Sequence, residues 1–171
     1  MEDLHKRWPH RWLTPKAKPG ESTIHRYGIF ANEDIKKGEP INVFGGLAVP
    51  KTEIEEYRKI ISHAGIQVSD DFFIVPASND EIVEQGIFNH SCEPNVGFNS
   101  SVTMTAIRNI KAGEELLMNY AFMESFFDSF ECNCGSPKCR KVIDNNTWKD
   151  KEFQEKYLEY YSPYLKEKIR V

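Results

Sequence analysis

The sequence predicts one mainly β domain with a few short helices, and three observations support this expectation. The chain has 171 residues, 40% hydrophobic and 12% aromatic, which is enough for one folded core but hardly for two. Most apolar runs are short and are separated by turns that contain Gly or Pro, as expected for strands. Helical periodicity is convincing in one early segment and fits the C-terminal tail.

Composition also restricts the expected partners and compartment. The net charge of −4 argues against a general nucleic-acid binder and suits a basic protein partner better. No apolar run approaches the roughly eighteen residues that a membrane-spanning helix needs, so no membrane association is expected. The N-terminal residues lack the apolar core of a secretory signal, which predicts an intracellular protein of the cytoplasm or nucleus.

Residues 1–20 are expected to form an N-terminal arm that mixes basic and aromatic side chains. These are Lys6, Arg7, Trp8, Arg11 and Trp12. We expect the arm to pack its two Trp side chains on the domain. The alternative is weak contact between this arm and nucleic acid, through charge and stacking.

Short strands and turns are expected from Glu21 onward. Residues 22–31 predict a strand, a tight turn at Gly28 and a second strand. Gly38 and Gly113 each precede an apolar run in similar sequences, which indicates one turn chemistry used twice. A buried strand is expected at 71–76 and a half-buried strand at 102–107.

Helices are expected in three places. Thr52 and Glu55 have the spacing of a capping box, and one helical face would carry Ile54, Tyr57, Ile60 and Ile61. A single helical turn is expected at 80–85, ending at Gly86. From Trp148 the aromatic spacing predicts an amphipathic helix that Pro163 breaks or kinks. Its apolar face, which we expect to pack on the domain, carries Phe153, Tyr157, Tyr160, Tyr161 and Tyr164.

The cysteines predict a metal site. Cys132, Cys134 and Cys139 have C-x-C-x4-C spacing around a turn-forming Gly and Pro, so three thiolates can converge on one ion. Disulfides are disfavoured inside cells, and a tetrahedral Zn²⁺ needs a fourth ligand, for which Cys92 remains. We therefore expect one structural zinc per chain. The alternative is four unrelated reduced cysteines.

Cys92 lies in an unusually polar turn, F-N-H-S-C-E-P-N, at residues 88–95. His90 and Cys92 are two residues apart and could form a nucleophile pair. A cysteine that binds zinc cannot also be a free nucleophile, and no third orienting group is evident. We therefore prefer the zinc interpretation, which leaves Asn89, His90 and Asn95 to be explained.

Three motifs explain them, because in order they resemble those of the SET-domain protein lysine methyltransferases. They are N-H-S-C-E-P-N at 89–95, G-E-E-L-L-M-N-Y at 113–120 and C-x-C-x4-C-R at 132–140. Residues 26–31 also resemble the family's G-x-G-[VI]-F-A cofactor loop. The resemblance implies a SET domain at 21–122 with a helical insert at 51–63, a post-SET zinc segment at 130–141 and a C-terminal helical tail at 148–171.

The resemblance implies a SET-domain (β-clip) fold in which the N-H-S-C segment and the last strand form a pseudoknot. S-adenosylmethionine and the target lysine would enter from opposite faces. The implied cofactor-binding residues are Arg26, Tyr27, Gly28, Phe30, Asn89, His90 and Tyr120. Tyr120 would also be the catalytic tyrosine, with a substrate channel formed by Phe44, Phe98 and Met118. The implied zinc ligands are Cys92, Cys132, Cys134 and Cys139.

The chain departs from the family pattern at four positions. Arg26 replaces the first glycine of the cofactor loop, and Asn119 replaces an aspartate. Phe44 stands where many members have a channel tyrosine, and Met118 where Phe or Tyr is common. Because neither residue nor Phe98 carries a hydroxyl to restrict the amine, we expect the product to be di- or trimethyl-lysine.

The resemblance implies an S-adenosylmethionine-dependent protein-lysine N-methyltransferase that transfers methyl directly to a neutral lysine. The expected substrate is a basic protein or peptide, such as a histone tail or another lysine-rich protein. The main alternative is a catalytically silent SET fold that binds a basic peptide. A plain zinc-stabilised module would leave Asn89, His90 and Tyr120 unexplained.

Overall fold

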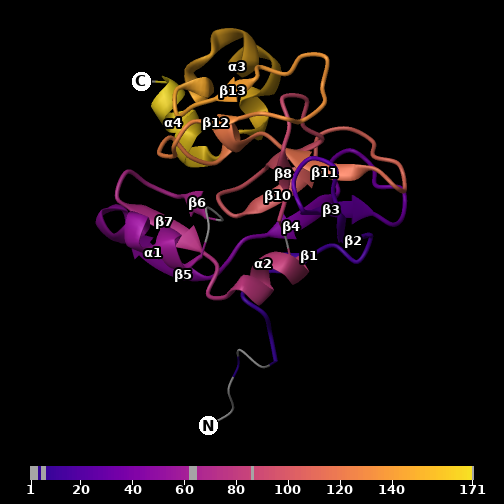
Figure 1. The fold of residues 1–171 in the computed structure, drawn as a ribbon, viewed down its shortest axis with the longest axis horizontal. Coiled ribbons are helices and arrows are strands. Elements are labelled where there is room, and N and C mark those ends of the chain that lie inside the picture. Colours follow the sequence, from indigo (N-terminus) through magenta and orange to yellow (C-terminus); the bar gives the residue numbers. More distant parts are fainter. Residues whose placement is uncertain (1–3, 5–6, 62–64, 86, 171) are drawn as a thin grey trace.

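The computed structural model describes residues 4, 7–61, 65–85 and 87–170, which form a mainly β fold with a few short helices (Figure 1). The main sheet has the strand order β1-β4-β10-β9-β11-β3-β2, and β8 also pairs with β11. Its strands are β1 (Trp12–Leu13), β2 (Ala17–Glu21), β3 (Tyr27–Ala31), β4 (Pro40–Val43), β8 (Asn89–His90), β9 (Val96–Phe98), β10 (Thr103–Ala106) and β11 (Glu115–Met118). Neighbours are antiparallel except that β11 runs parallel to β8 and β9.

The turns in this sheet are partly as expected. The turn of the β2–β3 hairpin lies at residues 22–26, where the Ser22 N–H donates to the Arg26 carbonyl at 2.9 Å, so the predicted turn at Gly28 is wrong. Gly28 instead lies within β3. Gly38 and Gly113 adopt nearly equal φ angles of 89° and 90°, as expected for one turn type used twice.

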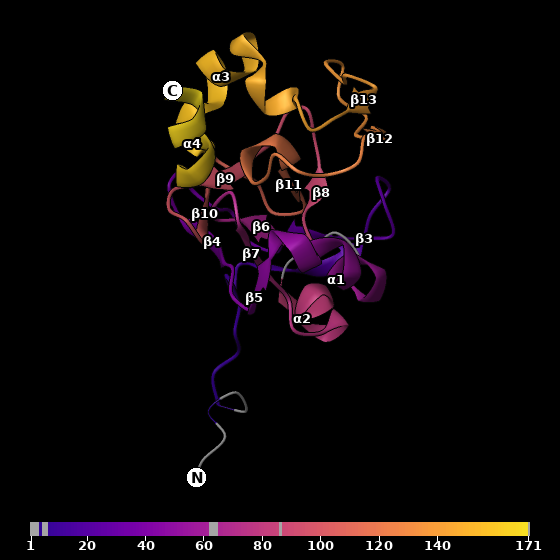
Figure 2. The same cartoon turned by 90° about the vertical axis from the view of Figure 1, so that its left-hand side faces the viewer.

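A second sheet lies beside the first and consists of β5 (Leu47–Pro50), β7 (Phe72–Val75) and β6 (Ile66–Gln67) (Figures 1 and 2). β7 is its middle strand. Phe73 and Val75 are fully buried and pack with Ile54, whereas Phe72 is exposed. The predicted buried strand is therefore buried on one face only, because its alternating side chains face opposite ways.

The early helix differs from its prediction in two details. A 3₁₀ turn (η2, Lys51–Glu53) precedes α1 (Ile54–Ile60), so Thr52 lies inside the turn and the capping box with Glu55 does not form. The Glu55 carboxylate instead accepts from Arg58 at 3.1 Å. Ile60 is 76% exposed, because six helical residues rotate it about 240° away from the buried Ile54.

Later helices include α2 (Asn79–Gln85), which extends the predicted turn by one residue; Gly86 lies outside the described residues. The tail forms η4 (Thr147–Lys149), α3 (Lys151–Tyr157), η5 (Leu158–Tyr160) and α4 (Pro163–Arg170), so the break at Pro163 is confirmed. The rings of Phe153, Tyr157 and Tyr161 surround Phe122 at centroid distances of 5.5, 5.8 and 5.1 Å. Each buried aromatic of this kind stabilises the fold by roughly 1.5–3 kcal/mol, so the tail is a packing face, as expected.

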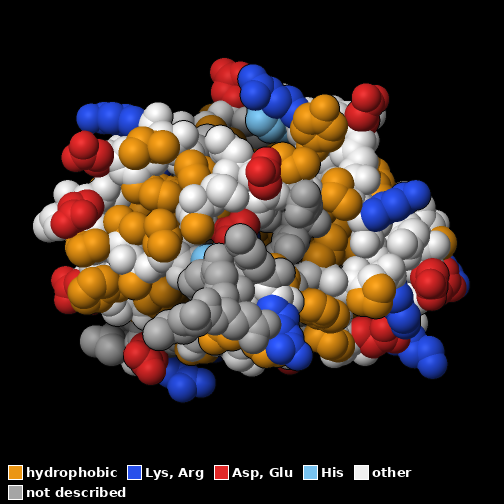
Figure 3. Space-filling view, turned by 90° about the horizontal axis from the view of Figure 1, so that it is seen from below, with side chains coloured by type: hydrophobic (Ala, Val, Ile, Leu, Met, Phe, Trp, Pro, Cys, Tyr) orange, Lys and Arg blue, Asp and Glu red, His pale blue; other side chains and the backbone are white. Residues whose placement is uncertain are grey.

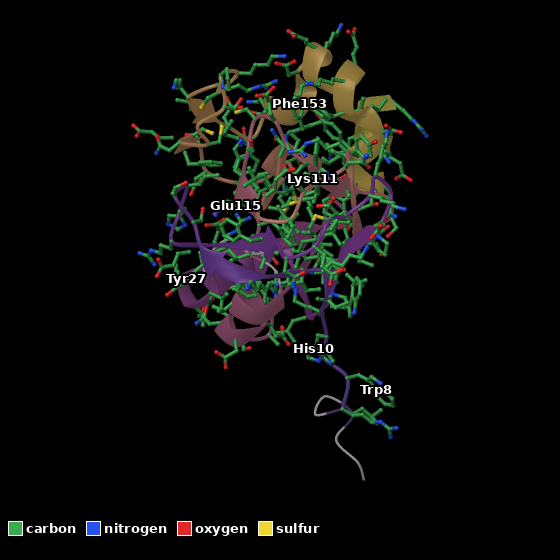
Figure 4. The ribbon with its side chains drawn as sticks, turned by 90° about the vertical axis from the view of Figure 1, so that its right-hand side faces the viewer. Trp8, His10, Tyr27, Lys111, Glu115 and Phe153 are labelled. Atoms are coloured by element: carbon green, nitrogen blue, oxygen red, sulfur yellow. The ribbon has the colours of Figure 1, made fainter. Side chains whose placement is uncertain are left out.

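The N-terminal arm does not pack its Trp side chains as predicted. Trp8 is 57% and Trp12 41% exposed, and Trp8 lies on the part of the chain that projects from the domain (Figure 4). Strands β1 and β2, by contrast, join the main sheet. On the face seen from below, apolar side chains form a broad area, and Lys and Arg are mixed with Asp and Glu (Figure 3). In the described part of the chain, no helix is long and apolar enough to cross a membrane.

The segment 88–95 crosses the end of β11 and is bonded to it by backbone and amide groups. Asn95 donates from Nδ2 to the Glu115 carbonyl at 2.8 Å and accepts the Leu117 N–H at 2.7 Å. The Ser91 N–H donates to the Met118 carbonyl at 2.8 Å. The N-H-S-C segment and the last strand of the main sheet are therefore joined, as the SET-like fold predicts.

Asn119 completes this crossing. Its Nδ2 donates to the Ser91 carbonyl at 3.0 Å, and its Oδ1 accepts the Ala121 N–H at 3.0 Å, with the side chain fully buried. An aspartate at this position keeps the acceptor but loses the donor.

We predict that Asn119→Asp lowers the free energy of unfolding by about 1–3 kcal/mol, because a buried carboxylate would face the Ser91 carbonyl. Denaturant unfolding measures this difference. Asn109→Asp is the matched control, since Asn109 is exposed and its Oδ1 only accepts, from the Lys37 N–H at 2.9 Å. That variant should change stability by less than about 0.5 kcal/mol. Equal effects of the two substitutions would contradict this account.

Candidate functional site

A cavity of about 550 Å³ lies where the crossing segments meet the two sheets. One part of its wall comes from residues 87–90, and another from the stretch that runs from Met118 to Asn133. Ile24 and His25 line it from the β2–β3 turn. Three further lining residues come from the end of the N-terminal arm, from the end of β4 and from α2, and these are Arg11, Phe44 and Ile82. Its size lies within the range of small-molecule and cofactor sites.

Asn89 ties the β2–β3 turn to the crossing. Its Nδ2 donates to the Glu115 carboxylate at 2.7 Å and to the Tyr27 carbonyl at 3.0 Å. Glu115 also accepts from the Ser22 hydroxyl at 2.9 Å, and Figure 4 shows Glu115 and Tyr27 on the same side of the molecule. A Cβ added to Gly28 would lie 2.1 Å from Glu115 Oε1 and 3.0 Å from Asn89 Nδ2, so a larger residue would displace these two hydrogen-bonded side chains.

His90 is held as a neutral imidazole. Its Nδ1 accepts the Tyr120 N–H at 3.2 Å, which leaves the proton on Nε2, and Nε2 faces the Cys92 sulfur at 3.7 Å. Burial, with a further contribution from the Arg140 charge, lowers the pKa of His90 to about 4. His90 therefore connects the tyrosine turn to the cysteine cluster.

Tyr120 begins the 3₁₀ turn η3 (Tyr120–Phe122) and is enclosed by aromatic rings. The rings of His90 and Phe130 lie 5.2 and 5.7 Å from its own. Its hydroxyl donates to the Phe88 carbonyl at 3.1 Å. Burial, with a smaller effect of Glu124, raises the pKa of Tyr120 to about 12. The side chain is therefore a neutral phenol whose oxygen retains lone pairs that can accept a hydrogen bond.

The cysteines gather beside this turn. The sulfurs of Cys92, Cys132, Cys134 and Cys139 all lie within 4.8 Å of one another. The Arg140 N–H donates to Cys92 Sγ and the Lys141 N–H to Cys139 Sγ, both at 3.4 Å. Four converging sulfurs supported by N–H donors are a suitable donor set for one tetrahedral metal ion.

The cluster joins three parts of the chain. The hairpin of β12 (Phe130–Glu131) and β13 (Val142–Ile143) carries its cysteines, and β8 leads directly to Cys92. Arg140 reaches the tail, where it pairs with Asp150 at 3.2 Å and lies 4.8 Å from the centre of the Phe153 ring. A bound metal would therefore hold residues 130–133, which line the cavity, against the N-H-S-C segment.

Comparison with known proteins agrees with this geometry. The family model described as "SET domain" matches residues 26–121, which is more than half of the chain. The chain belongs to the SET-domain family. Human "Histone-lysine N-methyltransferase 2B" is 31% identical over 152 residues, covering 81% of this chain and 6% of that protein.

Other relatives have similar names but different printed specificities. A Schizosaccharomyces pombe "Histone-lysine N-methyltransferase, H3 lysine-4 specific" is 33% identical over 137 residues, covering 73% of this chain and 15% of its own length. A mouse "Histone-lysine N-methyltransferase, H3 lysine-36 specific" is 31% identical over 132 residues, covering 68% of this chain and 5% of its own. The chain thus spans a small part of these relatives and resembles proteins named for different lysines.

The predicted cofactor loop follows the part of the β2–β3 turn that lines the cavity, and its contacts with a cofactor stay a prediction. The cavity is lined by Ile24 and His25, and its lining does not include Arg26, Tyr27, Gly28 or Phe30. Arg26, which replaces a family glycine, has a φ of 43°. This φ lies in the left-handed region, where a non-glycine residue carries strain of about 1–3 kcal/mol. The backbone thus has a conformation that favours glycine, although the residue is arginine.

The predicted channel residues are brought together only in part. Phe44 and Met118 line the cavity. Phe98 is fully buried and stacks behind Phe44, with ring centroids 5.9 Å apart, and is not among the lining residues. Its effect on the cavity is therefore through the position of Phe44.

Sequence reasoning missed two buried charged residues in the cavity wall. Glu124 accepts from Arg58 of α1 at 2.7 Å, and both side chains are almost fully buried. Burial, opposed by Arg58, raises the pKa of Glu124 to about 7. The second residue is Arg11. A lone acidic residue in the apolar run of 121–127 was the available indication for Glu124, but its partner lies 66 residues away.

We predict that the purified chain holds one zinc ion, bound by all four cysteines, and that Cys139→Ser reduces this well below one. Loss of the ion should clearly weaken S-adenosylmethionine binding but should lower the melting temperature only slightly, because the β core does not depend on the cluster. Elemental analysis, titration calorimetry and thermal unfolding measure the three quantities.

Ser136→Ala is the matched control for this prediction. Ser136 lies in the same segment, but its hydroxyl bonds Glu93 at 2.5 Å and is not part of the sulfur cluster. This variant should keep its zinc. Well under one zinc in the wild-type chain would show that the cysteines serve another purpose.

Proposed function

We propose that this chain is an S-adenosylmethionine-dependent protein-lysine N-methyltransferase. The observation that carries the proposal is the partly buried, neutral Tyr120 at the wall of an aromatic cavity, held beside His90 by the joined SET motifs. The names of its relatives support the same reaction class. The cavity volume of about 550 Å³ leaves room for a cofactor and an extended side chain to meet.

When bound, S-adenosylmethionine supplies a methyl group on a positively charged sulfur. The target nitrogen must have lost its proton, so that its lone pair forms the new C–N bond while the C–S electrons stay on sulfur. The residues of this chain exclude water and align the three atoms, which contributes several kcal/mol to lowering the barrier. The Tyr120 oxygen is positioned to orient the amine, and its raised pKa keeps it protonated.

Predicted cofactor contacts of Asn89 and His90 remain part of this proposal. Both side chains already have protein partners, so we propose that they act by shaping the cofactor end of the cavity. The four cysteines would hold zinc, and the ion would hold Phe130 and its neighbours over the bound cofactor. The proposed substrate is a basic protein tail, such as that of a histone. The relatives' differing names leave the target lysine to experiment.

A catalytically silent SET fold is the second candidate, and Arg26 in a strained glycine position favours it. Titration calorimetry separates the two functions at the first step. Heat on addition of S-adenosylmethionine supports the enzyme, and no binding at millimolar cofactor would leave only the binding module.

We predict that the wild-type chain transfers labelled methyl from S-adenosylmethionine to a core histone, and that Tyr120→Phe removes most of this activity. The phenylalanine ring fills the same space, so cofactor affinity should stay near the wild-type value while the rate falls. Methyl incorporation and titration calorimetry measure the two effects.

Asn89→Ala provides the contrasting control. It removes the donor that holds the Tyr27 carbonyl and Glu115. Cofactor affinity should therefore fall, while the rate of methyl transfer at saturating cofactor should change less. Full turnover in both variants would show that the reaction occurs elsewhere or not in this chain.

We also predict that the product is di- or trimethyl-lysine. Phe44 and Met118 line the cavity without a hydroxyl that could restrain the amine between transfers. Each missing hydrogen bond removes roughly 0.5–1.5 kcal/mol of restraint, or up to about tenfold in the balance of amine orientations. Mass spectrometry of a methylated peptide at long reaction times measures the product. A product that stays monomethylated would mean that backbone placement alone limits the space.

A further inference from the structure

Arg11 places a positive charge in the wall of the cavity. Its side chain is only 2% exposed, and its guanidinium carbon lies 4.7 Å from the centre of the Phe44 ring. Within the described part of the chain, its Nε and Nη1 have no hydrogen-bond acceptor. A buried arginine without a bonded anion is rare, because removing a charge from water is costly unless it is paired.

The backbone holds Arg11 at this place. The His10 carbonyl lies 1.8 Å from where a Cβ on Gly45 would be, so this close approach requires glycine. The His10 ring bonds Glu81 of α2 at 2.8 Å, and Trp12 pairs with Val43 in the sheet. Figure 4 shows His10 where the arm meets the domain. Arg11 thus lies between two anchored neighbours.

The charge persists near neutral pH. Burial lowers the pKa of Arg11 to about 10, and the nearby groups Glu81 and Tyr57 oppose that decrease. Glu124, which lines the cavity and contributes to the raised pKa of Tyr120, is offset by its 2.7 Å contact with Arg58. The other titratable groups that line the cavity are His25, His90, Asp128 and Glu131, with the phenol of Tyr120 and the thiol of Cys132. Arg11 therefore brings to the Phe44 ring a charge that has no bonded counter-ion in the described chain.

We propose that Arg11 makes the cavity select the uncharged form of the substrate amine, which is the only form that can accept a methyl group. This inference rests on the proposed lysine methyltransferase function. An ammonium group beside Phe44 would be repelled by the guanidinium, whereas a neutral amine would not. The Phe44 ring also stacks on Phe98 and lies under Arg11. The aromatic surface that could attract an ammonium group is therefore already in contact with these two side chains.

The consequence is a lower pKa for the bound lysine than desolvation by aromatic rings would produce alone. Free lysine has a pKa of about 10.4, so few amines are neutral near pH 7. Each unit of downward shift increases the neutral fraction about tenfold. Arg11 would therefore be a specificity-determining residue that acts through charge and needs no contact with the methyl group.

The test compares Arg11→Met, which removes the charge, with Arg11→Lys, which keeps it. The pH at which kcat at saturating peptide rises should move up by about one unit in the Met variant, because the bound amine then holds its proton more tightly. The Lys variant should stay close to wild type. A stacking role of Arg11 alone would lower the rate by the same factor at every pH.

A binding measurement gives an independent readout. It uses a peptide around the lysine that the histone assay identifies, and the same peptide with norleucine, which lacks the amine. Near pH 7 the wild-type chain should prefer norleucine, and Arg11→Met should reduce this preference about tenfold. If thermal unfolding shows that Arg11→Met does not fold, Arg11→Gln serves as the neutral variant. Equal affinity of the wild-type chain for the two peptides would by itself overturn the proposal.

The remaining outcomes are distinct. If no histone is methylated, the proposed function fails and this inference fails with it. If methylation occurs but the pH profiles of the neutral and charged variants coincide, only the role of Arg11 is wrong. A uniform increase in rate at all pH values on removing Arg11 would show that its side chain blocks the channel, and would also overturn the proposal.

Discussion

The crossing of residues 88–95 with β11 is the constraint on which the rest of the structure depends. The side-chain amides of Asn95 and Asn119 supply hydrogen bonds of the kind that a neighbouring backbone would supply, because each amide donates to one carbonyl and accepts from one N–H. Without these bonds, two chain segments would bury unpaired polar groups at the centre of the domain. The crossing also fixes His90 and Tyr120 beside each other, so the polar composition of the turn is required by the fold before any ligand is considered.

Much of the site could be predicted from sequence because its parts lie in short motifs. The C-x-C-x4-C spacing brings three sulfurs together locally, and only Cys92 had to be found across the chain. The position of Phe98 could not be predicted in this way, because strand register decides which face a side chain takes. Likewise the turn at 22–26 depends on pairing between β2 and β3, which overrides the local preference of Gly28 for a turn.

Buried charges were the least predictable part of the site. The sequence near Arg11 does not show that it is buried, and the apolar neighbours of Glu124 are only a weak indication, since each residue becomes buried through contact with distant segments. Arg58 comes from α1 and Glu124 from the stretch after η3, and their pairing holds these two parts together. Helix α1 therefore supplies a charged partner to the cavity wall.

The short turn η3 receives support from three separate regions. The crossing caps it through Asn119, the tail packs three aromatic rings around Phe122, and Arg140 connects that tail to the cysteine hairpin. A turn of three residues has little stability of its own, so the position of Tyr120 must come from these contacts. The tail and the cysteine segment, which lie outside the matched SET region, thus both contribute to the position of Tyr120, the tail through Phe122 and the cysteine segment through Phe130.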